Sequence, residues 1–207
     1  MAFSRLGQIA ALLLLATQQA SGVVISNVQS LVNYYNQQNG SIYITITIKD
    51  RGTLVGVDSG TRFLKDNGTD ATNNRNQFYV LISAHKDSNG NPYIYFQSRY
   101  FEDINDKTPN AISSPYDTTN LPAYAVKAVG AETGYDLGSP NLQWFTIIDL
   151  SGTTNVKLLH IQTGGYVHIT TTNSYTIPIG SASTGNFGSP APSTIALSTF
   201  QIDAFPI

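Results

Sequence analysis

The sequence contains no cysteine and few charged residues. Asp, Glu, Lys and Arg make up 12% of its 207 residues, with 11 basic side chains against 13 acidic ones. Without cysteine there are neither disulfide bonds nor thiolate metal ligands, so burial of apolar surface alone must hold the fold. Hydrophobic residues supply 41% of the chain, including 12 Tyr and 9 Phe, which suffices for a core. The sparse, balanced charge argues against a phosphate-binding face, so we expect no nucleic-acid partner.

The sequence patterns that usually carry catalysis are also missing. The chain has no Gly-x-Ser-x-Gly, no glycine-rich phosphate loop that opens a helix, and no His-Glu-x-x-His. Glu102, Asp103 and Asp106 form a short acidic cluster, but their spacing lacks the glycine turn and terminal glutamate of an EF-hand. We therefore expect a binding protein rather than an enzyme, with no metal or other cofactor, and Asp103 as a candidate ligand-binding residue.

The N-terminus has the features of a secretory signal peptide. Arg5 precedes an apolar run, Ile9–Ala16, which is much shorter than the roughly 20 residues of a membrane span. Small side chains at positions −3 and −1, Ala20 and Gly22, predict that residues 1–22 are removed by cleavage before Val23. Since no later segment approaches spanning length, we expect a secreted, extracellular protein.

The chain that remains, residues 23–207, has the length of one domain, in which residues 23–40 form an N-terminal extension. Two Asn-x-Ser/Thr sequons, at Asn39 and Asn67, lie in polar, turn-like stretches. In a eukaryotic secretory pathway both are candidate N-glycosylation sites, so the protein is a candidate glycoprotein.

The clearest strand is 42–48, where isoleucine alternates with tyrosine and threonine. Segment 26–35 has apolar residues at helical spacing and predicts a short helix with Ser26 as its cap. The polar, proline-containing segment 101–122 predicts a long surface loop. Further short strands are predicted at 53–57, 62–64, 77–83, 93–97, 100–103, 123–129, 143–148, 156–162, 166–170, 175–179 and 194–202.

These strands fall into three similar units. In each unit an apolar strand, a tight polar turn and an aromatic-led strand are followed later by a closing strand. The hairpins are 54–64, 94–101 and 159–169, and the closing strands contain Phe78, Phe145 and Phe200. This pattern resembles the β-trefoil fold, whose members repeat it threefold around a six-stranded barrel capped by three hairpins. We therefore predict an all-β protein of β-trefoil type, with a β-sandwich or jelly roll as the alternative.

The hydrophobic residues of the third hairpin predict its register. Pairing Leu159 with Ile169 places the apolar residues of both strands on one face. His160 and His168 then face each other on the opposite side, where two imidazoles could share a metal or respond to acid pH. Because a zinc site needs at least three protein ligands, we expect two solvent-facing histidines that form a candidate ligand site without a metal.

The aromatic residues divide into core and surface candidates. Trp144, Phe78 and Phe200 lie in closing strands, where they are most simply barrel core. Tyr100 and Tyr166 begin the second strands of two hairpins beside polar turns, where an aromatic face could stack on a sugar ring. Core capping is an equally good interpretation of these two tyrosines.

The resemblance to β-trefoil proteins implies a binding function, since many of them are lectins or protease inhibitors. We expect a carbohydrate-binding, lectin-like protein whose partner is a glycan. Lectins similar to the ricin B chain carry a Gln-x-Trp signature, whereas here Gln143 directly precedes Trp144, so that sugar site does not transfer. The alternatives are a trefoil protease inhibitor that binds an extracellular protein through the loop 105–122, and a structural or adhesive protein.

Overall fold

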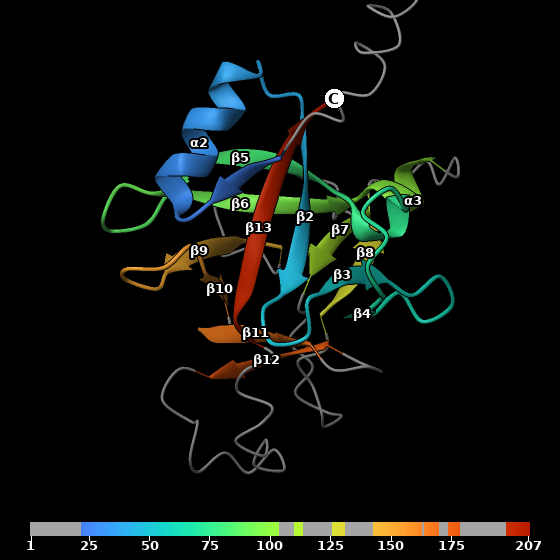
Figure 1. Cartoon of the computed structure of the whole chain (residues 1–207). Coiled ribbons are helices and arrows are strands. Elements are labelled where there is room, and N and C mark those ends of the chain that lie inside the picture. The colour runs from blue at the N-terminus through green and yellow to red at the C-terminus, as the bar shows by residue number, and fades with distance from the viewer. Residues whose placement is uncertain are drawn as a thin grey trace, which may run out of the picture.

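The computed structural model describes residues 22–103, 110–113, 126–130, 143–162, 164–169, 174–178 and 198–207. Figure 1 shows strands wrapped around a common centre, with a helix at the end opposite the β11–β12 hairpin. None of the helices in these ranges is long and apolar enough to cross a membrane. The elements are β1 (Val23–Ile25), α2 (Val28–Gln37), β2 (Ile42–Ile48), β3 (Thr53–Val57), β4 (Leu64–Asp66), η1 (Asn74–Asn76), β5 (Phe78–Lys86), β6 (Pro92–Ser98), α3 (Arg99–Asp103), β7 (Asn110–Ser113), β8 (Lys127–Gly130), β9 (Phe145–Asp149), β10 (Val156–His160), β11 (Gly165–Ile169), β12 (Ser174–Pro178) and β13 (Phe200–Pro206).

Strand β2 forms where the alternating isoleucines predict it. Ile42, Ile44, Ile46 and Ile48 are at most 3% exposed, while Tyr43 between them is half-buried. Each buried isoleucine contributes roughly 1.5–3 kcal/mol relative to an exposed one. The same alternation therefore builds the core on one face of β2 and leaves its other face for contacts outside the barrel.

The predicted helix is also present, as α2, but its cap lies one residue later than expected. The Asn27 side chain accepts a hydrogen bond from the Ser30 amide (2.8 Å), and the Ser30 hydroxyl accepts one from the Asn27 amide (3.2 Å). This reciprocal capping box, rather than Ser26, satisfies the free amides of the first turn. Val28 and Leu31 are buried on the inner face of the helix.

Six strands close into a barrel. β13 pairs with β2, β2 with β5, β5 with β6, β6 with β9, β9 with β10, and β10 with β13, all antiparallel. Each strand therefore has a neighbour on both sides, which removes exposed edges and excludes the two separate sheets of the alternative sandwich. β1 adds to the outside of β13.

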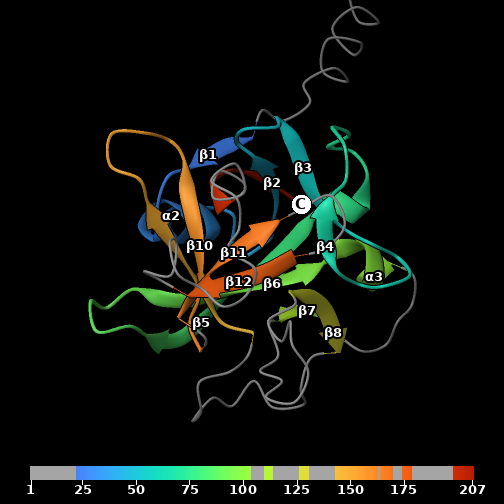
Figure 2. The same ribbon diagram turned by 90° about the horizontal axis from the view of Figure 1, so that it is seen from below.

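Three hairpins complete a threefold repeat. β3 pairs with β4, β7 with β8, and β11 with β12. Figure 2 shows these hairpins in a view from below. Strand, hairpin and closing strand thus occur three times, as β2 to β5, β6 to β9, and β10 to β13. The protein has the predicted β-trefoil fold.

All three units contribute to the core between the barrel and its hairpins. The closing-strand residues Phe78, Phe145 and Phe200 are at most 1% exposed, which confirms their predicted role. A small cavity of about 10 Å³, lined by apolar side chains, remains within this packing. Its lining side chains are Ile46, Leu64, Phe78, Phe96, Ile112, Val126, Phe145, Leu158 and Val167.

The second unit differs from its prediction. Residues 99–103 form the short helix α3 instead of a strand, because Phe101 anchors this turn in the core at 2% exposure. The hairpin of this unit is β7–β8 rather than 94–101. The predicted loop 101–122 therefore contains the end of α3 and strand β7, while its residues 104–109 and 114–122 lie outside the described ranges.

Candidate functional site

The two histidines of the third unit do not face each other as predicted. Leu159 lies opposite Tyr166, and His160 lies opposite Gly165, a shift of three residues. Side chains alternate between the two faces of a strand. A shift by an odd number of residues therefore places His168 on the face opposite to that of His160. His160 is fully buried with its ring centroid 5.1 Å from that of Phe145, and His168 is 3% exposed. The prediction of a solvent-facing pair is wrong.

The environment of His168 suits a structural residue. Burial, followed by the nearby positive charge of Arg51, lowers the pKa of its imidazole. Its Nδ1 atom is buried without a hydrogen-bond partner. Tyr166 lies under the Lys157 ammonium, which is 4.9 Å from the ring centroid. No group of three or more potential metal ligands occurs among the described residues.

Tyr100 and Asp103, by contrast, come together on α3. The Arg75 guanidinium of η1 lies 4.7 Å from the Tyr100 ring centroid. Asn74 donates a hydrogen bond to the Asp103 carboxylate (3.1 Å), and Arg99 Nε lies 3.7 Å from the same oxygen. This cluster of charged and aromatic groups is at the surface, since the Asp103 side chain is 42% exposed.

A row of aromatic side chains, which we call the aromatic row, begins beside this cluster. It consists of Phe205 on β13, Tyr43 on β2 and Tyr79 on β5, which lie directly opposite one another across neighbouring strands. The Phe205 and Tyr43 rings are stacked, with centroids 5.0 Å apart and planes only 12° from parallel. All three are half-buried. The outside of the barrel thus carries three neighbouring aromatic side chains, two of which are stacked.

Arg99 joins the aromatic row to the α3 cluster. Its guanidinium carbon lies 5.4 Å from the Tyr43 ring centroid and 5.9 Å from that of Tyr79. Its Nη1 donates a 2.7 Å hydrogen bond to the side chain of Gln77, which is 5% exposed. Two cation–π contacts and a buried partner fix the guanidinium, whose side chain is still 31% exposed.

Asp203 lies on the other flank of the aromatic row. It is two residues before Phe205 and therefore projects from the same face of β13. Gln201 donates to both of its carboxylate oxygens at 3.3 Å. Burial raises the pKa of Asp203, and the Gln201 hydrogen bond offsets only part of that effect. A carboxylate and a guanidinium thus border the aromatic rings on two sides.

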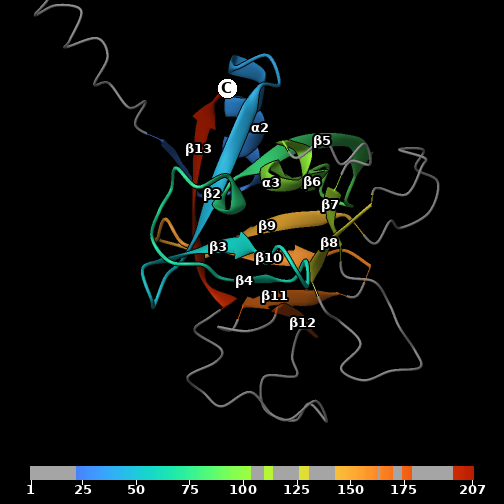
Figure 3. The same cartoon turned by 90° about the vertical axis from the view of Figure 1, so that its right-hand side faces the viewer.

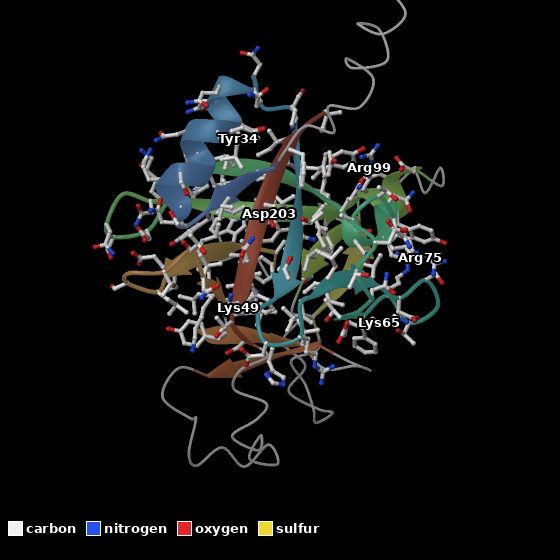
Figure 4. All side chains as sticks on the ribbon, in the orientation of Figure 1. Tyr34, Lys49, Lys65, Arg75, Arg99 and Asp203 are labelled. Carbon is white, nitrogen blue, oxygen red and sulfur yellow. The ribbon has the colours of Figure 1, made fainter. Side chains whose placement is uncertain are left out.

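Figure 4 shows how these groups are spread over the front of the barrel. Asp203 lies on β13 near the centre, Arg99 lies towards α3, and Tyr34 of α2 lies on the other side. Burial, together with the nearby Tyr43 phenol, raises the pKa of Tyr34. Figure 3 shows the same strands from the side, with β2 and β13 rising from the hairpin end towards α2.

Such an arrangement suits the binding of a sugar. An aromatic ring supplies a flat apolar face for the C–H groups of a pyranose, and charged side chains at its edge bind the hydroxyls with strong, directional hydrogen bonds. Fixed side chains lose little conformational entropy on binding, which favours affinity. Half-exposed Gln97, opposite Tyr79 on β6, adds an amide at the end of the aromatic row.

Sequence reasoning found two of these residues, Tyr100 and Asp103, and missed the aromatic row itself. One available signal was Tyr43, which lies between the isoleucines of the best-predicted strand and must therefore face away from the core. That Phe205 and Tyr79 lie beside Tyr43 follows only from the pairing of β13 with β2 and of β2 with β5.

The two sequons differ in accessibility. Asn39 is exposed and adopts a left-handed conformation, with φ of 52°, just after α2. Asn67 is partly buried, and its Nδ2, the atom that would carry a glycan, donates a 2.6 Å hydrogen bond to fully buried Asn76. A glycan at Asn67 therefore has to displace an internal contact, whereas one at Asn39 does not.

Comparison with known proteins gives similarity in fold alone. The sequence matches no protein-family model and no curated protein. Similar solved structures include the designed threefold-symmetric protein ThreeFoil, with 12% identity, coverage of 78% of this chain and 97% of that chain, and a TM-score of 0.49. The BEL β-trefoil has 9% identity, coverage of 79% and 93%, and a TM-score of 0.49. The SDF2-like protein from Arabidopsis thaliana has 12% identity, coverage of 81% and 95%, and a TM-score of 0.47. The β-trefoil assignment rests on the strand pairing itself.

Proposed function

We propose that this protein is a secreted, non-catalytic glycan-binding protein whose binding face is the aromatic row with Arg99 and Asp203. The observation that carries the proposal is the near-parallel stacking of Tyr43 and Phe205 between a guanidinium and a carboxylate on the outside of the barrel. Tyr100 and Asp103 would extend this face along α3.

Secretion is part of the proposal. Its support is the sequence of residues 1–22, with a cationic start, a short apolar run and small residues before Val23. A chain without cysteine folds in an oxidising compartment without disulfide exchange, so the absence of disulfides does not conflict with this route.

The test is glycan binding by the protein purified from the secretion medium, first on a glycan array and then by titration with the best ligand. Replacing Tyr43 by Ala removes the centre of the aromatic row and should weaken binding about tenfold or more. Tyr43→Phe keeps the ring and should retain most of the affinity. Arg99→Gln removes the charge and should also weaken binding.

Tyr166→Ala is the matched control, because Tyr166 is another half-buried tyrosine under a cationic side chain, but in the third unit. It should bind as the unchanged protein does. Thermal unfolding of each variant checks that the fold is retained. Absence of binding across the array, or equal losses in Tyr43→Ala and Tyr166→Ala, would refute the proposed site.

We also propose that Asn39, rather than Asn67, carries a glycan when the chain passes through a eukaryotic secretory pathway. Its exposure supports this choice, as does the internal hydrogen bond of Asn67. Peptide mass spectrometry of the secreted protein should find the glycan at Asn39, and Asn39→Gln should remove the corresponding mass. A glycan at Asn67 alone would contradict the proposal.

A further inference from the structure

Gly22 lies against the flank of β13 where Asp203 and Phe205 project. A Cβ atom at Gly22 would lie 2.6 Å from Cζ of the Phe205 ring and 3.2 Å from Cβ of Asp203. Only glycine fits between these side chains without a shift. Val23 follows Gly22 on the strand that lies beside Asp203, since β1 pairs with β13 in the register Val23–Ala204 and Val24–Asp203.

Asp203 is a carboxylate for which the described residues offer no cation. Its hydrogen bonds come from Gln201, and its neighbours across the strands are the uncharged Val24 and Thr45. Burial raises its pKa, which means that the negative charge is incompletely compensated in its surroundings. A single positive charge near β1 would compensate it.

We propose that cleavage of the Gly22–Val23 bond, which the signal-peptide pattern of residues 1–22 predicts, creates an α-ammonium group at Val23 that pairs with Asp203. A peptidase adds water across this bond. The water oxygen ends in the carboxylate of Gly22, and the Val23 nitrogen leaves as an amine. At neutral pH this amine is mostly protonated, because the usual pKa of an α-amino group is about 7.7–8.0.

The pair would hold the new N-terminus on the barrel. β1 contains only three residues and pairs with β13 alone, and its Val23 and Val24 are 43% and 40% exposed. Such a short edge strand is prone to fray. An ion pair at its first residue opposes fraying, and removal of Gly22 uncovers the edge of the Phe205 ring beside the ammonium. This inference rests on the proposed secretion and uses Asp203, which also borders the proposed glycan-binding face, but its test does not require a glycan.

The first part of the test is the N-terminal residue of the secreted protein, measured by intact mass and N-terminal sequencing. Val23 is the expected residue. A secreted chain that begins at any other residue would overturn the proposal, whether or not the protein binds a glycan.

The second part compares two purified chains, one that begins at Val23 and one that begins two residues earlier, at Ser21. Both keep every buried side chain of the described core, of which the first is Ile25. In the longer chain two further residues separate the ammonium from Val23. Asp203→Asn is introduced into each, and the folding equilibrium constant is measured by denaturant titration.

Asp203→Asn should reduce the folding equilibrium constant in the chain that begins at Val23 about threefold more than it does in the longer chain. A factor of this size is expected for the loss of a partly exposed ion pair. Asp149→Asn, which changes an exposed aspartate at the end of β9, should have the same effect in both chains. Equal effects of Asp203→Asn in the two chains would overturn the ion pair, even if cleavage occurs before Val23.

Discussion

At the scale of single residues, the buried histidines show how the core tolerates polar groups. His160 packs beside Phe145 at the bottom of the barrel, and His168 is buried in the β11–β12 hairpin. The pKa of His168 is lowered because burial and the Arg51 charge both disfavour its protonated form. A proton that binds the unfolded chain more readily than the folded one makes stability depend on pH.

The stability of the protein should therefore fall as the pH falls below the usual histidine value of about 6.5. In that range His168 binds a proton in the unfolded chain but not in the folded chain. This difference ends once the pH falls below the lowered pKa that His168 has in the folded protein. Between pH 7.5 and pH 5 we therefore expect the free energy of unfolding to fall through this residue.

Denaturant titrations at several pH values measure this drop. His168→Gln should show a flatter pH profile than the unchanged protein. The same slope in His168→Gln and in the unchanged protein would show that His168 does not couple folding to protons.

At the scale of elements, the first hairpin is held to η1 by asparagine side chains that pack on a glycine. Asn67 donates to Asn76, and Asn76 donates to the backbone carbonyl of Asp70 at 2.8 Å. A Cβ atom on Gly56 of β3 would lie 2.2 Å from the Asn76 side-chain oxygen and 2.7 Å from Asn67. This network depends on the absence of a side chain at residue 56.

Gly56→Ala should thus lower the free energy of unfolding by about 2 kcal/mol or more, since the methyl group overpacks the site and separates buried hydrogen-bond partners. Gly60→Ala is the control, because a Cβ there would have only one ordinary contact, at 3.5 Å. Chemical denaturation compares the two variants. A loss at Gly56 no larger than that at Gly60 would contradict this explanation.

The elements also show which parts of the fold the sequence predicts. β2 was predictable because isoleucine occupies only one of its faces. The pairing of β10 with β11 was not predictable, because β10 and the residue after it carry apolar side chains on both faces: Val156 and Leu158 on one, Leu159 and Ile161 on the other. The face that is buried in the core is the one that also carries His160. α3 is too short, at five residues, for a helical period to appear.

At the scale of the whole molecule, the threefold pattern was predictable but the location of the candidate site was not. The three closing phenylalanines mark the repeat, since each is the first residue of its closing strand and is at most 1% exposed. Sequence reasoning then directs attention to turns and hairpins, where β-trefoil proteins present their loops. The aromatic row instead lies on the barrel wall, where β13 of the third unit meets β2 and β5 of the first.

This arrangement explains why no single segment reveals the site. Phe205, Tyr43 and Arg99 come from three distant parts of the chain and meet because the barrel closes between its last strand and its first. The same closure fixes their spacing, since strands in a sheet lie about 4.8 Å apart. The proposed binding face is thus a property of the closed barrel.

The most direct test of this account is to locate a bound oligosaccharide by NMR, using the best ligand from the glycan array and backbone amide shifts of the labelled protein. The account predicts that the largest shifts occur at Tyr43, Tyr79 and Asp203, on the outside of β2, β5 and β13, and at Arg99 at the start of α3. Shifts confined to the β3–β4, β7–β8 or β11–β12 hairpins, with none on the barrel wall, would contradict it.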